Sequence, residues 1–244
     1  MIRLGVLASG GGTNLQAILD ACAAGRIDAR VAVVLSNVPG AGALARAEKA
    51  GVATEVLPSK GVTDRAAYDA QLAGRLQAHG VDLVCLAGYM RIVTPTFLRA
   101  FGPTEASRGC PRVLNIHPGL LPSFPGLHAQ KQALDYGARF AGCTVHFVDE
   151  GTDTGPIVVQ AIVPVLPGDD EASLSARILQ QEHRLYPLAV GLAVRVGLIF
   201  PTVAVEPEVL TGAMLPMVTP DVELALGSEL IVVPHVAQGV GAGS

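Results

Sequence analysis

Short runs of aliphatic residues alternate along this chain with segments of helical periodicity, and this alternation limits the fold more than any other feature. The runs occupy residues 2–8, 31–35, 52–57, 81–87 and 113–116, bounded mostly by Gly, Pro, Ser or Asn. Between the first two, Leu15, Ile18, Leu19 and Cys22 lie on one helix face, and Gly25 follows as an end signal. Such alternation predicts right-handed βαβ units. We expect an α/β fold, an open, mainly parallel twisted sheet with helices on both faces.

The remaining segments continue this pattern and then change it. Further helices are expected over residues 43–50 and after Thr63 or Asp64, either of which can cap a helix. Beyond residue 128 we expect a helix at 129–136, strands at 144–148 and 157–165, and a long helix from about residue 171. Pro187 falls inside that last helix, where it can introduce a kink.

The end of the chain has a composition of its own. Residues 201–244 contain five acidic residues, many Pro, Gly and Val, and no Lys or Arg. They show no helical period. We therefore expect one domain over residues 1–200 and a C-terminal extension over 201–244 that is partly strand or irregular.

Composition and charge narrow the classes of function. The chain is 50% hydrophobic with a formal net charge of −4 and no basic run, which argues against nucleic acid as a main partner. No apolar run reaches the about 20 residues of a membrane-spanning helix, and no signal peptide precedes the first strand. Four scattered cysteines, Cys22, Cys85, Cys110 and Cys143, are typical of reduced thiols. We expect a cytoplasmic protein.

A run of glycines joins the first strand to the first helix in LASGGGTNLQAIL, residues 7–19. Successive backbone N–H groups at such a helix start form an anion site. A dinucleotide motif would need glycine where Leu15 stands, and no P-loop lysine follows. Thr13 or Asn14 can alternatively serve only as an N-cap. We expect Gly12, Thr13 and Asn14 to hold the phosphate of a small substrate.

A second polar feature interrupts the strand in VLNIHPGLLPSFPGLH, residues 113–128. Asn115 and His117 are two residues apart, so they share one face of the strand just before Pro118 ends it. The ends of parallel strands meet at one edge of a sheet, so this pair and the glycine loop should lie close together. Asp153, in the loop between the next two strands, can reach His117, fix its tautomer and favour its protonated form.

These side chains suit attack by a substrate's own nucleophile on a carbonyl. No Ser, Cys or Lys lies near a suitable base, whereas an amide and an imidazole can stabilise an oxyanion and a carboxylate can assist proton transfer. A competing interpretation is a metal site built from His117, His128, His146 and Asp153. Their spacing matches no compact metal motif, so we expect no metal.

Five segments of the sequence resemble the phosphoribosylglycinamide formyltransferases, which take a formyl group from 10-formyltetrahydrofolate. The segments are GVLASGGGTNLQAIL, LAGYMRIVTPTF, VLNIHPGLLPSFPGLHAQKQAL, CTVHFVDEGTDTGPIVVQ and QEHRLYP. They follow the family's order from residue 1 to about 198. The resemblance implies a Rossmann-like formyltransferase fold, glycinamide ribonucleotide and formyl folate as small-molecule substrates, and a monomer or homodimer.

The resemblance also implies roles for individual residues. Asn115, His117 and Asp153 match the catalytic residues, Gly12, Thr13 and Asn14 the phosphate loop, and Glu182 a contact with the ribonucleotide. Arg65, Met90, Arg91, Ile92 and Val93 match the folate side, and Asp149 to Asp153 match the loop around the pterin. In the implied mechanism a neutral amine attacks the formyl carbon, Asn115 and His117 stabilise the oxyanion, and Asp153 positions the imidazole and a water. Met90 and Ile92 can alternatively be core residues, and Arg65 a solvated helix residue.

Some positions depart from the family pattern, and other functions share its core. Gly119 stands where the family usually has Ser, Thr152 where it has an aliphatic residue, and Leu179 where some members have a polar one. Methionyl-tRNA formyltransferase would need a basic surface and a larger C-terminal domain, and formyltetrahydrofolate deformylase usually has a domain before the core. A sensor of a phosphometabolite or folate is the non-enzymatic alternative.

Overall fold

A computed structural model describes residues 1–105, 107, 111–195 and 230–231. Its strands are β1 (Ile2–Ala8), β2 (Ala29–Ser36), β3 (Ala53–Val56), β4 (Leu83–Leu86), β5 (Val113–His117), β6 (Phe140–Phe147), β7 (Ile157–Pro164) and β8 (Leu230–Ile231). Its helices are α1 (Thr13–Ala23), α2 (Gly42–Lys49), α3 (Arg65–Ala78), α4 (Pro95–Ala100), α5 (Ala129–Tyr136) and α6 (Glu171–Arg195).

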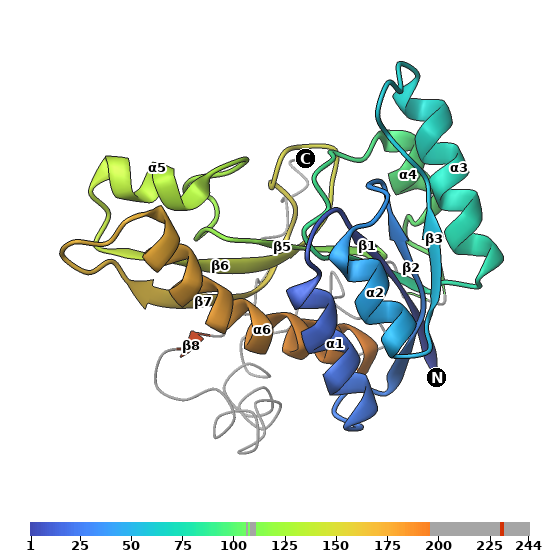
Figure 1. Ribbon diagram of the computed structural model, residues 1–244, viewed down its shortest axis with the longest axis horizontal. Helices are drawn as coiled ribbons and strands as arrows, with labels where there is room; N and C mark the ends of the chain where they lie inside the picture. The colour runs from blue at the N-terminus through green and yellow to red at the C-terminus, as the bar shows by residue number, and fades with distance from the viewer. Residues whose placement is uncertain (106, 108–110, 196–229, 232–244) are drawn as a thin grey trace, which may run out of the picture.

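The strands form one sheet in the order β3-β2-β1-β4-β5-β6-β7-β8 (Figure 1). Strands β1 to β5 are parallel, and β6, β7 and β8 are each antiparallel to the strand before them. The order reverses at β1, which pairs with β2 on one side and β4 on the other. Ligands of open α/β sheets bind at the carboxyl ends of the strands beside such a reversal.

The core has two parts, one on each face of the sheet. Leu4, Val6 and Ala8 of β1 pack in a cluster with buried residues of α1, α2, α5 and α6. Leu7 belongs to a second cluster, built with α3 and α4. Full burial of each large aliphatic side chain contributes about 1.5–3 kcal/mol to stability. Helices therefore cover both faces of a mainly parallel sheet, which confirms the predicted fold class.

The helix ends follow local signals in most places. Asp64 caps α3 by accepting a hydrogen bond from the N–H of Ala67 at 2.9 Å, and Gly25, just beyond α1, has a φ of 70°. Neither Thr13 nor Asn14 is the cap of α1, because Gly12 holds that position with a φ of 72°. Pro187 lies inside α6 without ending it.

A few predictions fall wholly or partly outside the described residues. Cys110 lies outside them, as does the extension except for β8, whose two residues pair with β7. The division into residues 1–200 and 201–244 stays a prediction. In the part of the chain that the structure describes, no helix combines the length and apolar character needed to cross a membrane.

Candidate active site

β5 carries two polar side chains to the carboxyl edge of the sheet. Its Leu114 and Ile116 point into the core cluster that contains α1 and α6, so Asn115 and His117 face the other way. β4 lies beside β5, and β1 with its glycine loop lies one strand further. The amide and the imidazole thus share a face at the edge where the glycine loop also ends.

The loop between β6 and β7 places Asp153 against this pair. One carboxylate oxygen, Oδ2, lies 3.3 Å from His117 Nδ1 and accepts a hydrogen bond of 2.8 Å from the N–H of Gly126. The other oxygen, Oδ1, lies 3.5 Å from Asn115 Nδ2. Asp153 has a φ of 56°, a left-handed conformation that costs a non-glycine residue about 1–3 kcal/mol. The structure therefore brings Asn115, His117 and Asp153 together around one strained loop residue.

The charge of Asp153 is stabilised despite its burial. Burial on its own raises the pKa of this carboxyl, but its contact with His146, the hydrogen bond from the N–H of Gly126 and the charge of His117 together hold the pKa below its ordinary value. The side chain is 14% exposed. Asp153 is therefore an ionised carboxylate at neutral pH.

The protonation of His117 depends on burial as well as on Asp153. An oxygen faces each ring nitrogen, Asp153 Oδ2 at Nδ1 and the carbonyl of Phe124 at 2.9 Å from Nε2, so only the protonated ring can donate to both. Burial nevertheless lowers the pKa of His117 and outweighs the opposing effects of Asp153 and the Phe124 carbonyl. Asp153 therefore favours the protonated form, as predicted, but desolvation is the larger effect and the pKa of His117 is lowered overall.

This balance gives a prediction for a titration. We expect NMR to find the pKa of His117 below 6.5 and lower still in Asp153→Asn, because the variant removes a charge that raises it. Since the unfolded ring takes up its proton at higher pH, the stability linked to His117 is present above the unfolded pKa and is lost as pH falls below it. An unchanged pKa in the variant contradicts the pairing.

His146 is a site residue that the sequence did not identify for this role. It lies opposite Asn115 in the antiparallel ladder of β5 and β6, and directly opposed residues share a face. Its Nδ1 lies 2.9 Å from the carbonyl of Phe147, and its Nε2 lies 3.1 Å from Asn115 Nδ2 and 3.5 Å from Asp153 Oδ1. An Nδ1–H that donates to Phe147 leaves Nε2 to accept from the Asn115 amide, which fixes the orientation of that amide.

Gly119 leaves the space that the His117 ring occupies. A Cβ at this position would lie 2.8 Å from His117 Nε2 and 3.2 Å from the Cβ of Ala129. We expect Gly119→Ala to displace the ring, weaken its contact with Asp153 and lower kcat by about 10-fold or more, since a misplaced catalytic group is costly. Kinetics checks this, with thermal unfolding to show that the fold persists. Unchanged kcat and an unchanged His117 titration would show that the ring tolerates the methyl group.

The start of α1, which follows the glycine loop, contacts α6 at the same edge of the sheet. Position 12 has no room for a side chain, because a Cβ on Gly12 would lie 2.6 Å from the Cα of Ala43. Asn14 donates from Nδ2 to Glu182 Oε2 at 2.7 Å. Burial raises the pKa of Glu182, and the Asn14 bond opposes that shift. Gly12, Thr13, Asn14 and Glu182 thus form one group, with helical N–H donors beside a buried acid.

The residues that match the folate side also gather in space. Arg65 donates from Nη2 to the carbonyl of Ile92 at 2.7 Å, and the guanidinium of Arg91 lies 4.4 Å from the ring centre of Tyr68. Met90 and Ile92 are 67% and 57% exposed, so the alternative that they belong to the core is wrong. Val93 is buried in the core. The loop after β4 therefore presents apolar side chains to solvent beside two arginines.

Asp149 and His128 have partners of their own outside the Asn115 group. Asp149 accepts hydrogen bonds from the hydroxyl of Thr154 at 2.7 Å and the N–H of Gly151 at 3.1 Å, so it braces its own loop. His128 is 72% exposed and its Nδ1 lies 3.3 Å from Glu171 Oε1, whereas His117 and His146 are buried and each contacts Asp153. Within the described residues, no group of three or more His, Cys, Asp or Glu side chains is arranged to hold a metal ion.

Comparison with known proteins points to one family. A family model described as formyl transferase matches residues 2–190. The chain is 49% identical over 209 residues to the trifunctional purine biosynthetic protein adenosine-3 of Drosophila melanogaster. The matched region covers 85% of this chain but 14% of that protein. The chain is 45% identical over 186 residues to the phosphoribosylglycinamide formyltransferase of Escherichia coli K12, and this matched region covers 76% of the chain and 84% of that enzyme. The chain thus spans a small part of the insect protein and most of the bacterial one.

Solved structures agree with the sequence relatives. Glycinamide ribonucleotide transformylase 1 from Symbiobacterium toebii is 57% identical, with a TM-score of 0.75, over 80% of this chain and 88% of that one. Phosphoribosylglycinamide formyltransferase from Bacillus halodurans is 38% identical, with a TM-score of 0.73, over 80% of this chain and 96% of that one. The likeness in sequence and in fold extends over most of the chain. This protein therefore belongs to the formyl transferase family, among the phosphoribosylglycinamide formyltransferases.

Proposed function

We propose that this chain transfers the formyl group of 10-formyltetrahydrofolate to the amine of glycinamide ribonucleotide in purine biosynthesis. The products are formylglycinamide ribonucleotide and tetrahydrofolate. One observation carries the proposal beyond family membership: Asp153 lies within 3.5 Å of both Asn115 Nδ2 and His117 Nδ1. An amide donor, an imidazole and a carboxylate around one point suit transfer of an acyl group to an amine.

The reaction requires two bond changes and one proton transfer. The lone pair of the neutral amine attacks the formyl carbon, and the carbonyl oxygen becomes an oxyanion. Asn115 Nδ2 keeps its hydrogen bond to His146 and turns its second N–H, which faces Asp153 Oδ1 at 3.5 Å in the resting protein, to the oxyanion. The bond between the formyl carbon and the folate nitrogen then breaks. The proton that leaves the amine ends on that nitrogen, so no other reactant is consumed.

His117 is suited to carry this proton. Its lowered pKa keeps the resting ring neutral and able to accept the amine proton. The imidazolium that forms lies between Asp153 and the developing oxyanion, and both negative charges stabilise it. In the neutral ring that donates from Nδ1 to Asp153, Nε2 carries the lone pair that takes this proton. Nε2 faces the carbonyl of Phe124 at 2.9 Å in the resting protein and donates to the oxyanion once it is protonated.

The two substrates approach this group from different sides. The phosphate of the ribonucleotide binds the N–H groups of Gly12, Thr13 and Asn14, and Glu182 lies beside its ribose. The folate lies along Arg65, Met90 and Ile92. Cytoplasmic location and a monomeric or homodimeric state stay predictions.

An assay of folate turnover tests the proposal. The purified protein is mixed with 10-formyltetrahydrofolate, with and without glycinamide ribonucleotide, and folate absorbance is followed. Turnover that requires the ribonucleotide supports formyl transfer. Equal turnover without it indicates the hydrolase, and absence of turnover in both mixtures with measurable binding indicates a sensor.

A further inference from the structure

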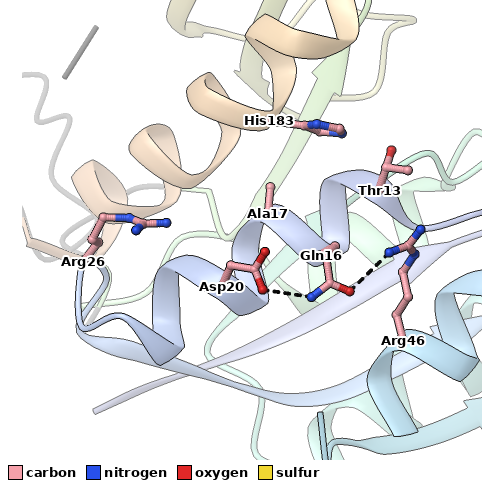
Figure 2. Close-up of a pocket in the computed structure, with 7 residues that line it drawn as sticks. All are labelled: Thr13, Gln16, Ala17, Asp20, Arg26, Arg46 and His183. Atoms are coloured by element: carbon pink, nitrogen blue, oxygen red, sulfur yellow. Dashed lines mark hydrogen bonds between the residues drawn. The ribbon is translucent and has the colours of Figure 1, made fainter. Parts of the chain in front are cut away.

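A cavity of about 320 Å³ opens beside the glycine loop, between α1, α2 and α6 (Figure 2). Its lining includes Thr13, Gln16 and Asp20 of α1, Arg46 of α2, His183 of α6, and Arg26. Figure 2 shows Thr13, Arg46 and His183 at one end of this part of α1 and Arg26 at the other. Two arginines therefore line this cavity: Arg46 at the end beside the glycine loop and Arg26 at the far end.

Arg46 is held against the phosphate loop itself. Its Nε donates to the carbonyl of Gly11 at 2.7 Å, and its Nη1 donates to Gln16 Oε1 at 3.3 Å. Gln16 in turn donates from Nε2 to Asp20 Oδ1 at 2.9 Å. In the part of the chain that the structure describes, no carboxylate forms an ion pair with Arg46. The guanidinium is thus fixed at the loop, and its charge is not neutralised by an acidic partner.

The phosphate of the ribonucleotide needs such a charge. A phosphate monoester carries about −1.5 to −2 at neutral pH. The residues already assigned to it, Gly12, Thr13, Asn14 and Glu182, supply N–H donors and an acid but no cationic side chain. N–H groups at a helix start supply only about half a positive charge. The remaining negative charge requires a cation from elsewhere.

His183 cannot supply this charge in the free protein. Burial and the nearby positive charge of Arg46 lower the pKa of His183, so its ring is neutral at pH 7. Its Nε2 is buried without a hydrogen-bond partner among the described residues. The ring therefore keeps an unused polar atom at the cavity, next to a permanent charge.

We infer that Arg46 is the cationic residue that binds the ribonucleotide phosphate, from the cavity beside the glycine loop, with His183 as its neighbour. This inference rests on the proposed function and adds a binding residue to it. Arg46 completes a site in which Gly12, Thr13 and Asn14 donate N–H groups and a guanidinium supplies the charge. An arginine fixed by Gly11 and Gln16 is already oriented for a second, charge-assisted set of hydrogen bonds.

Kinetics of Arg46→Gln test the inference. We expect KM for glycinamide ribonucleotide to rise about 10- to 100-fold, since a hydrogen bond to a charged group is lost, with KM for formyl folate and kcat nearly unchanged. Inhibition by inorganic phosphate weakens in parallel. Arg26→Gln is the matched control, because it removes the same charge from the far end of the same cavity. Equal effects of the two substitutions overturn the inference.

Arg46→Lys separates charge from bracing of the loop. Lysine keeps the positive charge but cannot make both hydrogen bonds, so we expect KM to stay within about 10-fold of wild type. A lysine variant as weak as the glutamine variant shows that Arg46 only supports the Gly11 carbonyl, which overturns the inference. Thermal unfolding of each variant shows whether the fold persists, and the lysine variant remains informative if the glutamine variant unfolds.

A titration of His183 tests the same point without any formyl transfer. We expect inorganic phosphate to raise the pKa of His183 in the wild-type protein, because the anion offsets the charge of Arg46. In Arg46→Gln we expect the pKa of His183 without phosphate to be higher than in the wild type, and phosphate no longer shifts this pKa. Absence of a phosphate-dependent shift in the wild type contradicts the inference. Since this measurement needs no folate, it distinguishes failure of the Arg46 site from failure of the proposed function.

Discussion

Asn115→Ala is expected to lower kcat about 10²- to 10³-fold, which corresponds to about 2.7–4 kcal/mol of lost transition-state stabilisation. The amide is positioned in the resting protein by His146 at 3.1 Å and by Asp153 at 3.5 Å. Only the longer of these two hydrogen bonds is exchanged when the oxyanion forms, and the amide itself stays in place. The KM values change little, because this hydrogen bond strengthens mainly in the transition state. Steady-state kinetics with both substrates measures the effect.

Asn115→Asp is the matched variant for this prediction. It keeps the size of the side chain but replaces a donor with an acceptor and places a second carboxylate beside Asp153. We expect it to be at least as slow as the alanine variant at neutral pH. Thermal unfolding confirms that each variant is folded. Turnover close to wild type in either variant removes Asn115 from the oxyanion site.

Asp153→Asn is expected to lower kcat by a similar factor, about 10²- to 10³-fold, because a preorganised charge next to the reacting groups is lost. Asparagine fits the same space but cannot balance the imidazolium of His117 after it accepts the amine proton. Measuring kcat across pH checks this prediction. Wild-type turnover in the variant at every pH would remove Asp153 from the mechanism.

The same substitution changes how stability depends on pH. The pKa of Asp153 is lower in the folded protein than its ordinary value of 3.8. Its contribution to stability is therefore present above that value and is lost as pH falls through the folded pKa. Asp153→Asn removes this acid-dependent part. Unfolding experiments at several acidic pH values detect the difference.

Asp169→Asn is a control for the effects of Asp153→Asn on kcat and on the pH dependence of stability. Asp169 lies just before α6 and pairs with Arg177 at 2.7 Å, and that pairing holds the pKa of Asp169 far below its ordinary value. The substitution also removes a stabilised carboxylate, but one outside the catalytic group. We expect a lower melting temperature and a kcat within about twofold of wild type, as for a structural ion pair.

The sequence predicted the features that depend on local patterns. The first strand was predicted at residues 2–8 and forms at Ile2–Ala8, because its aliphatic run ends at a glycine loop. The spacing of Asn115 and His117 was enough to place both on one face of β5. Helix α4 was missed because its six residues, Pro95–Ala100, are too few to show a helical period.

Features that depend on pairing between distant segments could not be read in this way. The role of His146 depends on the register of β6 against β5, which sets it opposite Asn115. The lowered pKa of His117 depends on how deeply the folded chain buries its ring, and the spacing of residues in the sequence does not predict that burial. The position of Arg46 likewise results from α2 packing on the glycine loop, where its side chain reaches the carbonyl of Gly11.

The fate of the formyl carbon tests the central claim most directly. The protein is supplied with 10-formyltetrahydrofolate that carries ¹³C in the formyl group, together with glycinamide ribonucleotide, and the carbon is followed by NMR. Direct transfer predicts that the label appears as the formamide carbon of the ribonucleotide, in equal amount to the tetrahydrofolate formed. Label that appears as free formate while the ribonucleotide amine stays unmodified would contradict the account.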